Sequence, residues 1–221
     1  GRHTWCRSAG ARRACRRDPC TTADGAEPVT LRNPPDRWGG VSQLLHWLVV
    51  ALILTTGILG LVMGDMRNSP TKIEIYALHK SLGLTMLALA TLRLLWRLYA
   101  GAPRPAPGPR WQNRLASLTH SLLYGLLLAI PLSGWTFNSA AGYPLQWFKL
   151  FNLPPLVTRD ADLRQLAGNV HELLFWTLVG LALLHAAAAL YHHIFQRDDT
   201  LARMLPRGWL RARTPTPPLQ D

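Results

Sequence analysis

The sequence predicts an all-α integral membrane protein, a four-helix bundle with its function inside the bundle. Of its 221 residues, 16% are charged and 48% are hydrophobic. The charges are sparse in four long apolar segments, and about twenty apolar residues in a helix cross the roughly 30 Å hydrocarbon core of a bilayer. Four such spans leave no room for a separate soluble domain. Although a net charge of +12 would suggest nucleic acid for a soluble protein, we expect membrane lipid and no nucleic acid as partner.

The four spans are expected at about residues 42–64, 75–98, 114–136 and 169–195. The core of the first, LLHWLVVALILTTGILGLVM, contains one ionisable side chain, His46. Pro131 interrupts the third span. The connection GAPRPAPGPR is rich in proline and predicts a stiff spacer. The long connection from about residue 137 to 168 mixes aromatic residues with proline, which is typical of a segment at the membrane interface.

The two ends of the chain differ in composition from the spans. Residues 1–36 lack apolar periodicity, so we expect a disordered arm, or an artefact of a misplaced start. Its cysteines, at positions 6, 15 and 20, match neither a covalent haem-attachment pattern nor a zinc pattern. Residues 37–206 form the predicted transmembrane domain, and residues 207–221 a predicted disordered tail.

The positions of Lys and Arg predict the orientation of the spans. Eight Arg lie before the first span, five between the second and third, and five after the fourth. The two other connections together carry five basic residues, with Lys80 left uncounted inside a span. Because Lys and Arg concentrate in short cytoplasmic loops, both termini are expected on the cytoplasmic side of a bacterial inner membrane.

Histidines are the most informative residues of the spans. Seven of the eight lie in the spans or at their ends, and ionisable groups inside a bilayer tend to mark a function. His171 and His185 are fourteen residues apart on one helix, which brings them to nearly the same face about 21 Å apart along the axis. One metal cannot take both. Two sites at two depths are therefore expected.

The predicted topology supplies a partner for each. His46 begins the first span and matches the cytoplasmic depth of His185, while His79 begins the second span and matches the outer depth of His171. Two bis-histidine sites without carboxylate or thiolate ligands suit the iron of b-type haem better than hydrolytic zinc, which keeps an open coordination position. We therefore expect two haem b groups between the helices, held by these four axial ligands.

Other residues are candidates for supporting roles, each with a structural alternative. Arg93 follows His79 by fourteen residues and is expected to pair with haem propionates or to reach the inner interface as a snorkelling side chain. His120 and His192 lie at the cytoplasmic side without an assigned iron, so they are expected to contact a quinone or to be structural. Glycines near the ligand faces either admit a macrocycle or serve helix packing: Gly57, Gly60 and Gly83.

From Arg37 to Pro206 the chain resembles the bacterial cytochrome b561 family of four-helix, two-haem membrane proteins. The matching segments are LLHW, LHKSLGL, LTHSLLYGLLLAIPLSGW, NVHELL and LLHAAAALYHHIFQRDDTLARMLP. The resemblance carries the family's haem ligands onto His46, His79, His171 and His185. It implies electron exchange with ubiquinone and, in one branch, the oxidation of superoxide to oxygen.

Two alternatives remain open at this stage. Cytochrome b subunits of hydrogenases and formate dehydrogenases share the four-helix plan and serve a larger enzyme, so the chain is alternatively an electron-carrier subunit. A haem-free transport or proton-conducting bundle is a remote alternative. Whether the chain is an enzyme, as a superoxide:ubiquinone oxidoreductase, depends on an electron donor that the sequence does not identify.

Overall fold

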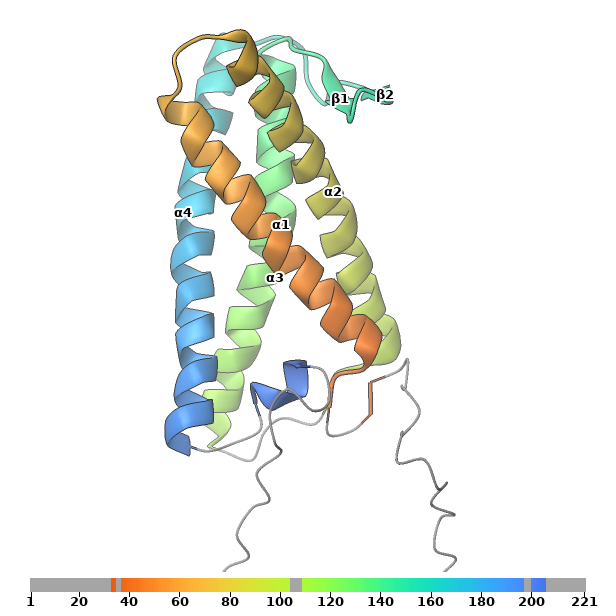
Figure 1. Ribbon diagram of the computed structural model, residues 1–221, viewed down its shortest axis with the longest axis vertical. Helices are drawn as coiled ribbons and strands as arrows, with labels where there is room; N and C mark the ends of the chain where they lie inside the picture. The colour runs from red at the N-terminus through yellow and green to blue at the C-terminus, as the bar shows by residue number, and fades with distance from the viewer. Residues whose placement is uncertain (1–32, 35–36, 104–108, 197–199, 206–221) are drawn as a thin grey trace, which may run out of the picture.

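The described residues form a bundle of four long helices (Figure 1). The computed structural model describes residues 33–34, 37–103, 109–196 and 200–205. The helices are α1 (Gly40–Asp65), α2 (Pro70–Ala100), α3 (Arg110–Ala140) and α4 (Ala161–Tyr191). Each is long and apolar enough to cross a membrane, which confirms the expected four-helix membrane fold. The expectations for residues 1–32 and 207–221 lie outside the described residues.

Local chemistry sets where the helices begin and end. Ser69 caps α2 by accepting a hydrogen bond from the Lys72 backbone, and Pro70 occupies the first helical position, where its missing N–H costs nothing. Gly101, at φ 75°, ends the same helix. Asp160 caps α4 through the Leu163 backbone. Each cap satisfies a backbone group that the helix itself leaves unpaired.

Helix α4 begins at Ala161, earlier than the span expected from residue 169. Its first turns carry Asp162, Arg164 and Gln165, which are polar and extend the helix beyond the apolar thickness of a bilayer. The hydropathy of the sequence marks only the membrane-embedded part of the helix. The helix itself continues out of the membrane to its Asp160 cap.

A small β-hairpin lies in the connection between α3 and α4. Strands β1 (Leu145–Trp147) and β2 (Phe151–Leu153) are antiparallel, with Leu145 opposite Leu153. In Figure 1 the hairpin lies beside the N-terminal part of α2. Ser81 of α2 accepts a hydrogen bond from the Phe148 backbone, and Trp147 Nε1 donates to Thr85 Oγ1 at 3.0 Å. This part of the predicted loop is therefore ordered against the bundle.

The bundle has a thin core and a broad apolar surface. The core cluster consists of Val49, Met86, Ala90, Leu127, Ile130 and Leu178. Many large apolar side chains face outward, among them Leu54 at 61% and Leu98 at 73% exposure. Such a surface would aggregate in water, but it matches the hydrocarbon of a bilayer. The packing therefore agrees with a multi-pass membrane protein.

The two ends of the bundle have different structures. At one end, here named the loop end, α1 meets α2 and α3 leads through the hairpin to α4. At the other, the terminal end, α1 begins and α4 continues as a short π-helix (His192–Gln196), with a 3₁₀ turn (Ala202–Met204) near the start of α1 (Figure 1). The described residues 201–205 are named the strap.

The strap is hydrogen-bonded to the start of α1. Gln43 Nε2 donates to the Arg203 and Leu205 carbonyls at 3.2 and 3.3 Å, and Trp47 Nε1 donates to the Met204 carbonyl at 3.0 Å. Nearby, Asn33 accepts hydrogen bonds from the Gly39 backbone and the Ser42 hydroxyl. Asn33 belongs to the segment expected to be a disordered arm, yet it takes part in this network at the terminal end.

Candidate functional site

The histidines of the four helices gather at two depths. His79 and His171 lie near the beginnings of α2 and α4, toward the loop end. His46, near the beginning of α1, and His185, near the end of α4, lie toward the terminal end. His120, near the beginning of α3, shares that depth. Along the four helices, these histidines therefore lie at two levels of the bundle.

At the loop end, His79 and His171 face each other across the bundle. Their ring centroids are 6.3 Å apart, with 78° between the ring planes. Metal–imidazole bonds are about 2 Å long and the centroid lies about 1 Å from each ring nitrogen, so two imidazoles on one iron stand about 6 Å apart. The observed distance of 6.3 Å between the ring centroids is close to this value.

The backbone fixes the orientation of both rings. His79 Nδ1 lies 3.1 Å from the Thr56 carbonyl of α1, and His171 Nδ1 lies 3.0 Å from the Ile130 carbonyl of α3. When Nδ1 carries the proton and donates it to a carbonyl, Nε2 of the neutral ring is left with its lone pair. Both imidazoles are therefore held in the tautomer that binds a metal through Nε2.

Glycines make these carbonyls accessible. Gly60 stands four residues after Thr56, and Gly134 stands four residues after Ile130, so each is one helical turn beyond the carbonyl that its histidine contacts. A Cβ on Gly60 would lie 3.4 Å from His79 Cε1, and a Cβ on Gly134 would lie 3.1 Å from His171 Cε1. The missing side chains leave room for the rings.

Ser133 strengthens one of the two anchors. Its hydroxyl donates to the Ile130 carbonyl at 2.8 Å and lies 3.0 Å from His171 Nδ1. The sequence does not indicate that Ser133, Gly134 or the carbonyls of Thr56 and Ile130 take part in this site. Of these residues, only Gly134 could have been noticed in the sequence, because it is a glycine within an apolar span, close to Pro131 and Ser133. Which carbonyl a histidine reaches depends on helix rotation, which the sequence does not show.

The terminal-end cluster contains three histidines. The rings of His120 and His185 are in contact, with centroids 5.2 Å apart. His46 lies close enough to both for electrostatic interaction, although no ring contact between His46 and His185 is found among the described residues. His46 Nδ1 is buried and has no hydrogen-bond partner among those residues. Such an atom is costly unless a ligand or partner engages it.

Two arginines of α2 stand beside this cluster. Arg93 is close enough to His46, His120 and His185 for its charge to act on each. Its guanidinium carbon lies 5.5 Å from the centroid of the Tyr124 ring, and that of Arg97 lies 5.6 Å from the same ring. The structure therefore directs Arg93 toward the candidate ligands and adds Arg97, which the sequence analysis did not select.

The remaining candidates from the sequence are His192 and three glycines, and their surroundings differ. His192 begins the π-helix, where its ring contacts Tyr191. A Cβ on Gly57 would lie 3.2 Å from the Phe175 ring, so that glycine serves helix packing. A Cβ on Gly83 would meet nothing within 4 Å. Gly60 alone of the three touches a candidate ligand.

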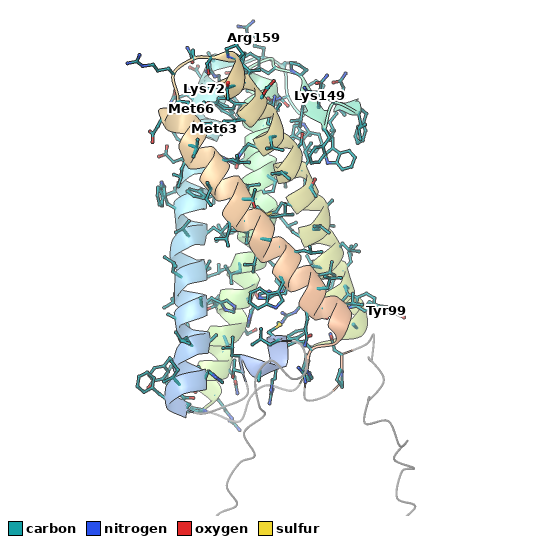
Figure 2. All side chains as sticks on the ribbon, in the orientation of Figure 1. Met63, Met66, Lys72, Tyr99, Lys149 and Arg159 are labelled. Carbon is teal, nitrogen blue, oxygen red and sulfur yellow. The ribbon has the colours of Figure 1, made fainter. Side chains whose placement is uncertain are left out.

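Charge is distributed unequally between the two ends. Figure 2 shows Lys72, Lys149 and Arg159 at the loop end. All described Asp and Glu residues lie in the loop-end half, so basic side chains there are largely balanced: Asp65, Glu74, Asp160, Asp162 and Glu172. The described residues of the terminal end include six arginines and no acidic side chain: Arg37, Arg93, Arg97, Arg110, Arg114 and Arg203.

The arrangement restricts the chemistry of the site. Within the described residues, no group of three or more His, Cys, Asp or Glu side chains is placed to hold a bare metal ion. The facing imidazoles of His79 and His171 instead suit iron that brings its own equatorial ligands. Such iron exchanges electrons without releasing the ligands.

Comparison with known proteins agrees with this geometry. The family model for prokaryotic cytochrome b561 matches residues 37–207. The chain is 34% identical to cytochrome b561 homolog 2 of Escherichia coli K12 over 188 residues, which are 81% of this chain and 97% of that protein. It is 30% identical to the probable superoxide oxidase CybB of Yersinia pestis, over 74% of this chain and 92% of that protein. It is 29% identical to cytochrome b562 of Cereibacter sphaeroides, over 73% and 90%.

The match covers all four helices, both histidine levels and the strap. The relatives are matched over nearly their whole lengths, so the resemblance concerns the complete membrane bundle. The family implies b-type haem, electron transport and a place in the bacterial inner membrane. The chain belongs to the prokaryotic cytochrome b561 family of membrane electron-transfer proteins.

Proposed function

We propose that this protein is a di-haem b cytochrome that carries electrons from the loop end of the bundle to ubiquinone at the terminal end. His79 and His171 are the axial ligands of the loop-end haem, and His46 and His185 those of the terminal-end haem. The observation that carries the proposal is the facing of His79 and His171, with ring centroids 6.3 Å apart. Bound haem supplies reversible one-electron chemistry, which the chain's own side chains lack.

The residues at the loop end fit such a group. The Thr56 and Ile130 carbonyls orient the two imidazoles, and Gly60 and Gly134 leave room beside them. Outer partners of this kind fix the tautomer and raise the basicity of a ligating imidazole. The chain therefore arranges Nε2 of each ring before the iron arrives, which lowers the entropy cost of binding.

The terminal-end ligands are proposed from depth and from the family motif. His46 and His185 stand at the same depth, and the buried, unpartnered His46 Nδ1 marks a side chain whose surroundings are incomplete among the described residues. His120, in ring contact with His185, then remains for hydrogen bonding to the quinone. His192 lies seven residues beyond His185, about two helical turns, at the start of the π-helix, and is the second candidate for quinone contact.

Superoxide is the proposed electron donor, because a relative named as a probable superoxide oxidase is 30% identical to this chain. Two superoxide anions would each lose one electron to become oxygen, and one ubiquinone would gain both electrons and two protons to become ubiquinol. Positive side chains of the loop end would attract the anion: Lys72, Lys80, Lys149, Arg159 and Arg164. Because acidic residues share this end, the attraction would act locally and would weaken with salt.

A redox assay on the purified protein tests the proposal. A pyridine haemochrome spectrum should give two haem b per chain, and none would refute it. Superoxide generated outside proteoliposomes should then reduce ubiquinone faster than in protein-free liposomes. Two haems without that acceleration would exclude superoxide as donor. Co-purification with a dehydrogenase that reduces the haems would instead identify an electron-carrier subunit of a larger complex.

A further inference from the structure

The terminal end contains two arginines without a described counter-ion. Arg93 and Arg97 are one helical turn apart on α2, both partly buried, and each acts electrostatically on neighbouring groups. No salt bridge to either is found among the described residues, and every described Asp and Glu lies in the opposite half of the bundle. Two like charges inside a membrane protein are costly unless an anion joins them.

Aromatic side chains hold both guanidiniums. Arg93 and Arg97 flank the same Tyr124 ring at 5.5 and 5.6 Å, and Arg97 also lies 5.6 Å from the Trp38 ring. Cation–π contacts stabilise a cation but do not neutralise it. The two donors are thus fixed in place while their charge remains, which is the arrangement expected of an anion-binding site.

The surroundings limit which anion fits. Both arginines line a narrow recess with Trp38, Trp96 and Tyr124, and Met204 of the strap lines the same recess. The Trp96 indole donates to Ser42 at 3.2 Å. Arg93 is also within electrostatic range of His46 and His185. The charge therefore lies between the proposed terminal-end ligands and the end of the bundle.

We infer that Arg93 and Arg97 form a paired site for the two propionate carboxylates of the terminal-end haem, with Tyr124 and Trp38 positioning the guanidiniums and Met204 closing the recess. This inference rests on the proposed function. Two guanidiniums match two carboxylates in charge, and a guanidinium binds a carboxylate through a planar pair of donors. The guanidiniums would offset the negative charge of the ionised propionates, which otherwise stabilises the oxidised haem, so the pairing would make the haem easier to reduce.

Redox titration of the haem-loaded protein tests the inference. Arg97→Gln removes one positive charge, so the terminal-end haem should become harder to reduce. We expect about a tenfold shift of its reduction equilibrium, which is about 59 mV for a one-electron couple. Its midpoint potential should also gain a dependence on pH, because a propionate without its arginine takes up a proton more readily. The loop-end haem should keep its potential.

Matched variants separate charge from packing. Arg114→Gln neutralises an exposed arginine at the same end and should leave both potentials unchanged. Arg97→Lys retains the charge and should restore most of the lost potential. An Arg97→Gln protein with two haems and unaltered potentials would overturn the inference while leaving the proposed function intact. Absence of haem from the unmodified protein would refute the proposed function instead.

Two other carboxylate or phosphate sources are tested in the same way. An anionic lipid headgroup would make the effect of Arg97→Gln depend on the charge of the lipid, so the effect should persist in nanodiscs of pure phosphatidylcholine as in nanodiscs with phosphatidylglycerol. Loss of the effect without anionic lipid would overturn the assignment. Asp36, Asp198 and Asp199 lie outside the described residues and adjoin segments of the terminal end in the sequence, and replacing each by Asn should leave the potential unchanged. A rise equal to the Arg97→Gln fall would identify that aspartate as the partner instead.

Discussion

His171 packs against Gly134, whose missing side chain lets the imidazole reach the Ile130 carbonyl at 3.0 Å. His79 and Gly60 repeat this relationship at the Thr56 carbonyl. One rule therefore orients both rings of the loop-end pair: a glycine one turn after a carbonyl exposes that carbonyl to a histidine of the neighbouring helix. A carbonyl on a rigid helix is a more precise anchor than a flexible side chain, because it has no rotamers to lose.

The glycine positions make a direct prediction. Gly134→Ala would place a methyl group 3.1 Å from His171 Cε1, closer than van der Waals contact, so the ring must move away from the carbonyl. We expect retention of the loop-end haem to fall by about tenfold or more, as for other lost outer partners of a metal ligand. Haem content after dialysis against a haem-binding protein measures it.

The same helix offers a control for that variant. A Cβ on Gly125 would meet nothing within 4 Å, so Gly125→Ala should retain both haems. Because Ala is a better helix former than Gly by about 1 kcal/mol, it should not lower the thermal stability. Equal haem loss in both variants would mean that α3 tolerates no alanine and that Gly134 has no particular role beside His171.

Replacing the loop-end ligands should affect one haem only. His79→Ala and His171→Ala should remove or alter the same spectral species, because both rings belong to one facing pair. Low-temperature visible spectra and electron paramagnetic resonance distinguish the two haems. Tyr143→Phe, which changes an exposed side chain of the loop end, is the control and should leave both signals. Loss of different species in the two ligand variants would contradict the pairing.

At the terminal end, the ring contact in the structure and the family motif indicate different partners for His185. His185 is in ring contact with His120, whereas the motif and the depth match assign His46 as its partner on the iron. We predict that His46→Ala loses the terminal-end haem, while His120→Ala keeps two haems and slows ubiquinone reduction. Haem stoichiometry together with quinone kinetics decides this. One haem in the His120→Ala protein would make His120 the ligand.

Much of this architecture follows from the sequence because the bilayer imposes it. The thickness of the hydrocarbon region sets the length of each span, so hydropathy locates all four helices. Alternating direction then places residues near a span's beginning or end at a known depth. That is why His79 and His171, more than ninety residues apart, were expected at one level, and the structure places their rings together.

The remaining features depend on long-range packing. The hairpin has strands of only three residues, in a segment interrupted by proline, so its periodicity is too short to detect. Arg97 resembles any interfacial arginine until Tyr124 of another helix is seen beside it. The roles of Gly134 and Ser133 require the rotation of α3 relative to α4. Each of these features is a contact between two elements, so the sequence of either element alone does not predict it.

The strap provides the last prediction. Trp47 Nε1 donates to the Met204 carbonyl at 3.0 Å, and Trp47→Phe removes this donor while retaining an aromatic ring. A hydrogen bond of this type contributes about 1 kcal/mol, so backbone amides of residues 201–205 should exchange about fivefold faster by hydrogen–deuterium mass spectrometry. Trp111→Phe, at an exposed tryptophan of the same end, should leave that exchange unchanged.

If exchange in the strap is equally fast in the unmodified protein and both variants, the contact does not hold the strap in solution. If the strap loosens as predicted, the recess beside Arg97 loses Met204 as its cover, so greater access of water should accompany the faster exchange.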